Sequence, residues 1–307
     1  MQYILSPHNP DIVYTGTYRA VSFDVTNVDN IVIDSLSESL TDPLEYISGY
    51  HTITSLDESP IVEGLLYYGT ADGNVWRRLD GIWEQINNGI EKYYVTSIKA
   101  SPNEANTVYV TLSNYGADDD SPRIYRSDNN GDTWESIHNG LPGGAVNDII
   151  IYPEFEDKLL FAATNVGIYG SLDKGVSWER VGANMPFIPV NDMAFNLFEN
   201  TLVAGTYGRS INTYDLTQVF LQIDPSSTFE TNYTRIDISP NPSTDFINIK
   251  SNTEISSLEL FTIQGRSLWN KEYRSRVDVS GLQTGTYFLS MKNKKGEIIG
   301  VQKIIKK

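Results

Sequence analysis

Residues 171–178 read Ser-Leu-Asp-Lys-Gly-Val-Ser-Trp, and this octapeptide predicts a tight β-hairpin. The Asp173 carboxylate can accept hydrogen bonds from the backbone amides of its own turn, and Gly175 can take a positive φ without steric cost. We expect Ser177 to tie the far side of the turn and Trp178 to cover the strand pair as an apolar anchor. The segment therefore favours β-structure over helix.

The same pattern occurs twice more. Residues 127–134 read Ser-Asp-Asn-Asn-Gly-Asp-Thr-Trp, and an eroded copy at 80–83 keeps only the Gly and the Trp. The three segments resemble the Asp-box of sialidase-like and sortilin-like β-propellers, also called the BNR repeat. That resemblance implies structural hairpins on the outer rim of a propeller, away from any catalytic centre. The Asp-box residues are Ser127, Asn129, Gly131, Thr133 and Trp134, then Ser171, Asp173, Gly175, Ser177 and Trp178, with Gly81 and Trp83 in the eroded copy.

The surrounding sequence repeats in the same register. The tryptophans of the three segments are 51 and 44 residues apart, and the apolar strands that follow them begin at residues 95, 146 and 190, with the same two intervals. Each repeat contains further short apolar runs divided by Gly, Pro and Asn, as strands and turns are. Four short strands in ~40–50 residues is the period of a propeller blade.

This period predicts an all-β fold with a β-propeller of about five visible blades over residues 1–220. The first unit has no box and the fifth stops after its third strand. We expect either a fragment that lacks N-terminal blades or a small five-bladed ring, and the fragment is the preferred interpretation. The units are 1–49, 50–92, 93–143, 144–187 and 188–219.

Composition excludes several classes of protein. The 307 residues contain no Cys, so disulfides, zinc–thiolate sites and a Cys nucleophile are excluded. No apolar run approaches the ~20 residues that a membrane-spanning helix needs. The segment from 235 onward has 12 Lys and Arg against 7 Asp and Glu, or +5, which leaves −21 on the rest of the chain. An acidic body argues against nucleic-acid binding.

Residues 221–234 form a polar connector with little apolar surface, where we place the domain boundary. From 235 the character changes to short alternating strands with turns at 264–266 and 294–297. About seven strands in this length predict an Ig-like β-sandwich over 235–307.

The landmarks of this second domain resemble the type A C-terminal sorting domain of the type IX secretion system of Bacteroidetes. The resemblance implies recognition by the secretion machinery, export across the outer membrane, removal of the domain near the connector, and release or attachment at the cell surface. It also implies a signal peptide; residues 1–7 contain none, which again suggests a missing N-terminus. The sorting-signal residues are Pro240, Asn241, Pro242, Gly265, Gly285, Tyr287, Lys303, Lys306 and Lys307.

Candidate catalytic residues are few. A sialidase would need three convergent arginines, a Tyr nucleophile and a Glu partner, and the available arginines are Arg77, Arg78, Arg123, Arg126 and Arg209. A xyloglucan-cleaving propeller would use two aspartates as acid and base. Asp148 and Asp192 hold equivalent places in two repeats, and that repetition favours a structural role.

Metal and cofactor sites are not expected. Asp118, Asp119 and Asp120 could hold Ca²⁺ in part, but no calcium-loop pattern accompanies them and a solvated loop is favoured. The three histidines lie far apart without metal spacing. Aromatic side chains near strand ends could stack on sugars or peptides, although core packing explains most of them. They are Tyr18, Tyr50, Tyr93, Tyr94, Tyr115 and Tyr207.

The sequence thus predicts a secreted or cell-surface protein whose propeller binds a glycan or a protein, with no catalytic residues, cofactor, metal or membrane span. Two alternatives stay open: a glycoside hydrolase whose catalytic residues are partly absent, and a structural surface or adhesion protein.

Overall fold

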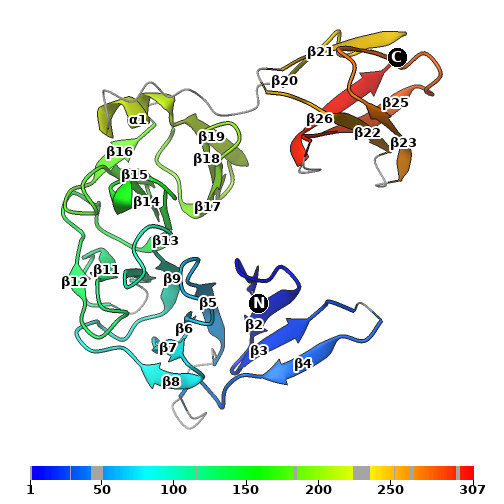
Figure 1. The fold of residues 1–307 in the computed structure, drawn as a ribbon. Helices are drawn as coiled ribbons and strands as arrows, with labels where there is room; N and C mark the ends of the chain where they lie inside the picture. The colour runs from blue at the N-terminus through cyan, green and yellow to red at the C-terminus, as the bar shows by residue number, and fades with distance from the viewer. Residues whose placement is uncertain are drawn as a thin grey trace. The chain divides into compact units, whose positions relative to one another are not determined.

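The computed structural model describes residues 2–27, 29–42, 51–114, 117–182, 185–223, 236–251, 253–262, 266–294 and 298–307. The chain divides into two compact units, Met1–Ser226 and Ser227–Lys307, each considered by itself below. Both are built of antiparallel β-sheets (Figure 1). The all-β prediction is confirmed. No helix within these ranges is long and apolar enough to span a membrane.

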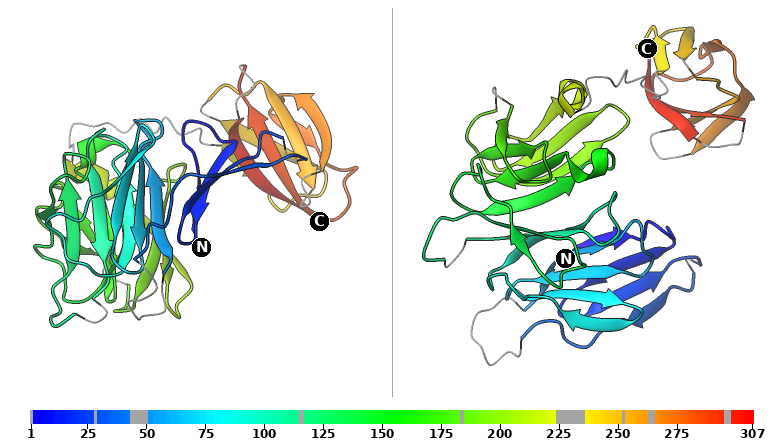
Figure 2. Two further views of the ribbon diagram at one scale, coloured as in Figure 1. Left: turned by 90° about the horizontal axis from the view of Figure 1, so that it is seen from below. Right: turned by 60° about the vertical axis from the view of Figure 1, so that its left-hand side comes forward.

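The first unit consists of five successive sheets, each a simple meander (Figures 1 and 2). Figure 1 shows the first strand of sheets two to five on the inner side of an arc and the last strand on its outer side. The strands are β1 (Tyr3–Leu5), β2 (Ile12–Gly16), β3 (Ala20–Asp24), β4 (Val32–Ser35); β5 (Ile53–Glu58), β6 (Leu66–Thr70), β7 (Val75–Leu79), β8 (Ile82–Gln85); β9 (Val95–Ala100), β10 (Val108–Leu112), β11 (Arg123–Ser127), β12 (Glu135–Ser136); β13 (Val146–Ile151), β14 (Leu160–Thr164), β15 (Gly167–Ser171), β16 (Glu179–Val181); β17 (Val190–Asn196), β18 (Thr201–Thr206) and β19 (Ile211–Asp215).

A repeated β-bulge joins the inner strands. Where β5 pairs with β6, β9 with β10 and β13 with β14, the pairing register skips one residue of the inner strand. The skipped residues are Thr54, Thr96 and Asn147. Each of them donates from its side chain to a carbonyl of the next inner strand, at 2.6, 2.6 and 2.8 Å respectively. A bulge re-aims a side chain in this way. The recurring polar residue after the first Ile or Val of these inner strands therefore links one sheet to the next.

The fifth sheet differs from the three before it. Among the described residues it has only the strands β17, β18 and β19, and the chain continues into the short helix α1 (Thr217–Ile223). Leu216 and Phe220 are buried there, and the Phe220 ring lies 4.9 Å from that of Tyr152. The first three residues of the predicted connector, 221–223, belong to α1. Residues 224–234 of it lie outside the described ranges.

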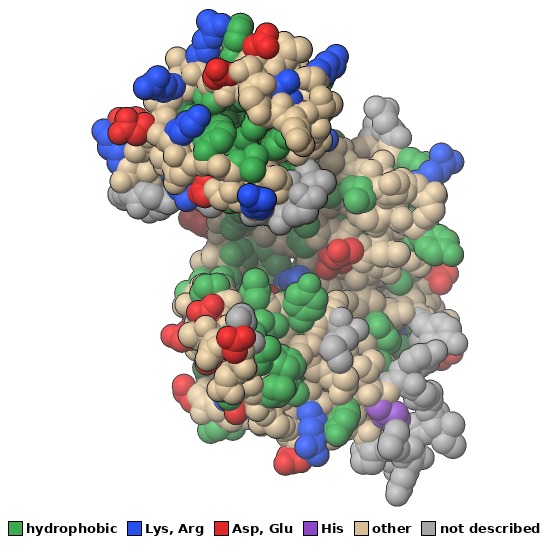
Figure 3. Space-filling model, turned by 90° about the vertical axis from the view of Figure 1, so that its right-hand side faces the viewer, with side chains coloured by type: hydrophobic (Ala, Val, Ile, Leu, Met, Phe, Trp, Pro, Cys, Tyr) green, Lys and Arg blue, Asp and Glu red, His purple; other side chains and the backbone are tan. Residues whose placement is uncertain are grey.

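The first sheet has an exposed apolar surface. Figure 3 shows hydrophobic side chains gathered over β1–β4. Tyr3, Leu5 and Ile33 are 72%, 58% and 61% exposed. The buried apolar residues of the unit form clusters to which neighbouring sheets both contribute.

The second unit contains seven strands among its described residues, in two sheets over one core. One sheet has the order β20-β21-β24 and the other β23-β22-β25-β26. Ile247 and Ile249 of the first sheet and Leu258, Leu260 and Leu289 of the second belong to the same buried cluster. The strands are β20 (Ile236–Ser239), β21 (Phe246–Ser251), β22 (Ser257–Thr262), β23 (Ser267–Glu272), β24 (Arg276–Asp278), β25 (Gly285–Lys292) and β26 (Ile298–Lys306).

Candidate functional site

Residues 171–178, predicted to form an Asp-box, hydrogen-bond to one another through side chains and the backbone of their turn. Ser171 Oγ accepts from the Gly175 amide at 2.8 Å and donates to Asp173 Oδ1 at 2.8 Å. Asp173 accepts from the backbone N and the Oγ of Ser177 at 2.9 and 2.6 Å. The Ser177 hydroxyl is the main hydrogen bond that lowers the Asp173 pKa, against the opposing effect of burial. Gly175 has a φ of +86°, where a β-carbon would lie 2.6 Å from the Ile137 side chain.

The third-sheet copy repeats this geometry with an amide in place of the carboxylate. Ser127 Oγ accepts from the Gly131 amide at 2.8 Å. Asn129 Oδ1 accepts from the Thr133 amide at 3.0 Å, while Asn129 Nδ2 donates to the Thr133 hydroxyl at 2.9 Å. Asn can replace Asp here because Asn129 Oδ1 accepts the same backbone hydrogen bond as Asp173 Oδ1 does in the other copy.

The three box tryptophans reach the preceding sheet. Trp178 Nε1 donates to the Ile137 carbonyl at 2.6 Å, and Trp134 Nε1 donates to that of Ile86 at 2.8 Å. Trp83, from the eroded copy, donates to the Leu36 carbonyl at 2.8 Å. Each acceptor directly follows the fourth strand of the preceding sheet. Each indole thus links two neighbouring sheets, a role that the sequence did not reveal; the sequence placed it over its own strand pair.

The predicted sorting-signal residues meet at one end of the second unit. Asn241, between Pro240 and Pro242, donates from Nδ2 to the Lys303 carbonyl at 2.7 Å and accepts from the Ile305 amide at 2.9 Å. The next residue but one, Ser243, pairs with the backbone of Ile305 and of Lys307 at 2.9 Å each. The Pro-Asn-Pro segment therefore holds the last strand of the chain.

The remaining landmarks lie on the strands next to this contact. Gly285 begins β25, which pairs along its length with the terminal strand β26. Tyr287 is buried, and its hydroxyl donates to the Gln283 carbonyl at 2.8 Å. Lys306 is buried with its Nζ 2.6 Å from the Lys307 carbonyl, whereas the Lys303 and Lys307 side chains are exposed. Gly265 lies outside the described residues.

The inner strands carry a small charged group. Asp148 is buried, and its carboxylate accepts from the Ile149 and Met193 amides at 2.9 and 3.0 Å. Burial raises the Asp148 pKa to about 6. The Asp57 carboxylate is the main cause of a raised pKa at Lys99, which also faces Asp148 and Asp192. Because Asp148 bonds the backbone of the next inner strand, its position supports the structural interpretation.

Three of the five arginines considered for a sialidase form ion pairs with different carboxylates. Arg77 pairs with Glu84 and with Asp132. Arg123 pairs with Glu91. Arg126, on the same strand as Arg123, pairs with Asp128 at 2.7 Å. These guanidinium groups are paired with nearby carboxylates and join neighbouring segments of the sheets.

The other candidates are scattered. Asp119 accepts from the Ser121 amide at 2.7 Å and lies 3.4 Å from Arg123. Within the described residues no group of three His, Asp or Glu is placed to hold a metal ion. Tyr207 is 75% exposed, and the Tyr93 ring stacks 4.4 Å from the Arg123 guanidinium. Tyr50 and Tyr115 lie outside the described ranges.

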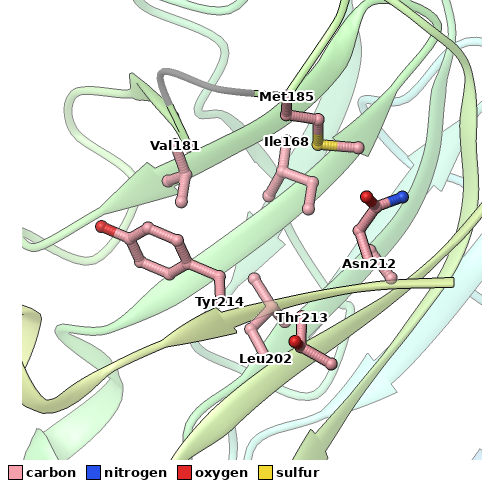
Figure 4. A pocket seen from close by; sticks show the side chains of 9 residues that line it. Ile168, Val181, Met185, Leu202, Asn212, Thr213 and Tyr214 are labelled. Atoms are coloured by element: carbon pink, nitrogen blue, oxygen red, sulfur yellow. The ribbon is translucent and has the colours of Figure 1, made fainter.

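One apolar cavity lies between the fourth and fifth sheets (Figure 4). It measures about 270 Å³. Figure 4 shows Ile168, Met185 and Leu202 pointing into it from different elements, with Asn212 and Tyr214 along one side. The remaining lining residues are Val181, Gly182, Ala204 and Thr213. In the sequence, the only indication of this cavity is that the last repeat stops after its third strand.

Comparison with known protein families identifies the type of domain that the second unit forms. Residues 237–307 match the family model described as the secretion system C-terminal sorting domain. The second unit is a sorting domain of this kind. The Asn241 contact and the paired strands β25 and β26 all fall inside the matched residues, so the sorting domain includes every sorting-signal position predicted from the sequence.

Two solved structures are similar over nearly the whole chain. One is PorZ, a surface component of the type IX secretion system of Porphyromonas gingivalis, with 13% identity, a TM-score of 0.48, and coverage of 100% of this chain and 51% of PorZ. The other is the extracellular domain of a hybrid two-component system of B. thetaiotaomicron, with 13% identity, a TM-score of 0.51, and coverage of 96% and 43%. The chain spans about half the length of these structures. None of the curated proteins compared with the chain matches it.

Proposed function

We propose that this protein is a cargo of the type IX secretion system, carried to the cell surface or released by its sorting domain, and that its five sheets are part of an Asp-box β-propeller that binds another macromolecule. The single observation that carries the first half is the sorting domain itself, matched over residues 237–307.

The folded form of the signal supports a role in recognition. Asn241 holds the terminal strand through two backbone hydrogen bonds, and the exposed Lys303 and Lys307 extend from that strand. Exposed cations on a rigid edge suit recognition by a partner surface, because little side-chain and backbone freedom is lost on binding.

The propeller assignment rests on the repeated sheets. Meander sheets follow one another with their first strands adjacent. The bulge contact recurs at the junctions from the second sheet to the fifth, and the indole contact at those from the first sheet to the fourth. A radial array of this type supports binding functions by presenting loops from a rigid frame.

Binding is favoured over hydrolysis by the state of the candidate acids. A glycosidase needs two carboxyl groups free to reach the substrate from opposite sides of the scissile bond. The Asp148 carboxylate is buried and already accepts two backbone hydrogen bonds. Arg77, Arg123 and Arg126 are likewise held in ion pairs.

The test is export from a type IX-competent host. A version with a secretory leader should reach the surface or medium when residues 227–307 are present and should accumulate in the periplasm when they are deleted. Arrival of the truncated protein outside the cell would refute the proposal. A matched control replaces exposed Lys294, away from the Asn241 contact, by Ala and should leave export unchanged.

A further inference from the structure

The residues that line the cavity between the fourth and fifth sheets are equivalent, by position in the repeat, to residues that surround a tryptophan elsewhere in this chain. Between the third and fourth sheets, Trp178 packs in one cluster with Ile124, Ile137, Leu141 and Leu160. By position in the repeat, these four correspond to Ile168, Val181, Met185 and Leu202, all of which line the cavity.

At the junction between the second and third sheets, apolar residues at the equivalent repeat positions also surround a tryptophan. There Trp134 packs against a cluster that contains Val75, Ile86 and Val108, with Ile90 beside it. The same repeat positions therefore surround an indole at two junctions and surround an empty space at the next. Burying an aromatic side chain removes ~150–250 Å² of surface from water, so a vacant seat of this kind is a strong site for one aromatic residue.

The neighbouring strand edge is open as well. In the fourth sheet, β16 pairs with β15 and follows directly after Trp178. In the fifth sheet no described strand pairs with the outer edge of β19. An open edge offers unpaired backbone donors and acceptors to an extended segment.

A backbone carbonyl also occupies the repeat position that accepts the indole N–H at the other junctions. Ile86 and Ile137 are the carbonyl acceptors of Trp134 and Trp178, and Val181 holds the equivalent place. The box tryptophans of this chain are already bound to Leu36, Ile86 and Ile137. A second copy in this same fold therefore has no box indole to donate.

We infer that the partner of this protein is a polypeptide whose extended segment adds to the edge of β19 and inserts a tryptophan into the cavity. This inference rests on the proposed binding function and narrows it from a glycan or a protein to a peptide strand. A cavity of about 270 Å³ with mainly apolar walls suits one side chain better than a sugar, since small-molecule sites measure ~300–1,000 Å³ and carry several convergent polar groups. Strand addition of this kind uses main-chain hydrogen bonds for affinity and a pocket for specificity.

The probe is a fluorescein-labelled synthetic peptide with the sequence of residues 171–182, titrated against the full chain by fluorescence anisotropy. We expect saturable binding, and at least tenfold weaker binding by the peptide that carries Trp178→Ala. Ala204→Trp in the protein should abolish binding by filling the cavity. Val203→Trp, which places the same side chain on the opposite face of β18, is the matched control and should bind as the unaltered protein does.

Hydrogen exchange on the unaltered chain keeps the test independent of how the variants fold. The peptide should slow exchange at the amides of Ile211–Asp215 and not in the sorting domain. Equal affinity of the Trp178→Ala peptide, or no protection of β19, would overturn the inference, as would protection of β19 by cellohexaose but not by the peptide. Export by the sorting domain is measured separately, so failure here leaves that assignment standing.

Discussion

At the scale of single residues, the indole of Trp178 contributes to stability in two ways. It is 4% exposed, and its N–H is bound to a carbonyl of the preceding sheet. Trp178→Ala should lower the free energy of unfolding of the first unit by about 3–5 kcal/mol, as large-to-small substitutions in a core do. Thermal unfolding followed by near-UV circular dichroism measures this.

Trp178→Phe is the matched control, because it keeps most of the apolar contact and removes the hydrogen bond. We expect a loss of about 1–2 kcal/mol. Trp83 is only half-buried, so Trp83→Ala should cost less than Trp178→Ala. Equal, negligible effects of both alanine variants would contradict the linking role of the indoles.

Asp148 should give the first unit a distinct pH dependence. Its pKa is raised by burial from 3.8 to about 6, so the folded state binds the proton more tightly than the unfolded state. Stability contributed by the protonated form is therefore lost as pH rises through about 4 to 6. Asp148→Asn has a neutral acceptor at every pH and does not lose this contribution. The free energy of unfolding of the variant, minus that of the unaltered protein, should therefore be about 2 kcal/mol larger at pH 7 than at pH 4.

Chemical denaturation of both proteins at several pH values measures this difference. Asp192→Asn, at the equivalent and exposed position of the next inner strand, is the control. A stability difference between Asp148→Asn and the unaltered protein that does not change with pH would show that Asp148 ionises normally in the folded state.

At the scale of elements, Asn241 and the terminal strand β26 form the contact that organises the sorting domain. Asn241→Ala removes a donor to Lys303 and an acceptor for Ile305. We expect a loss of about 1–2 kcal/mol of stability and faster amide exchange at Ile305. Hydrogen exchange measured by NMR would detect the change.

Asn248 is the matched control, because its amide also bonds a backbone carbonyl, that of Ser239, but on another strand. Asn248→Ala should leave the exchange of the terminal strand unchanged. Unaltered exchange at Ile305 in Asn241→Ala would mean that pairing with β25 alone holds the strand.

The sequence predicts the elements better than their junctions. Trp spacing and turn residues locate the hairpins, because the Ser, Asp, Gly and Trp positions are fixed by local geometry within eight residues. The cluster around Trp178 could not be predicted in this way, since Ile124 and Leu160 are far apart in sequence and look like any strand residue. Likewise, Pro-Asn-Pro identifies the sorting domain, but its contact with residues 303–305 spans more than sixty positions.

At the scale of the whole molecule, the two units have separate cores. Ile247 and Leu289 belong to a cluster made only of second-unit residues, and Ile98 and Ile149 belong to first-unit clusters. Calorimetry should therefore show two transitions, because each unit has its own buried apolar surface. Deleting residues 227–307 should remove one transition and leave the midpoint of the other unchanged; a shift of several degrees would reveal coupling between the units.

The amide of Asn241 has one more consequence. Unlike a carboxylate or an imidazole, it carries no titratable proton. The two hydrogen bonds of Asn241 to the last strand therefore form equally well at acidic and at neutral pH. A signal built on such a group would keep one shape on both sides of the envelope.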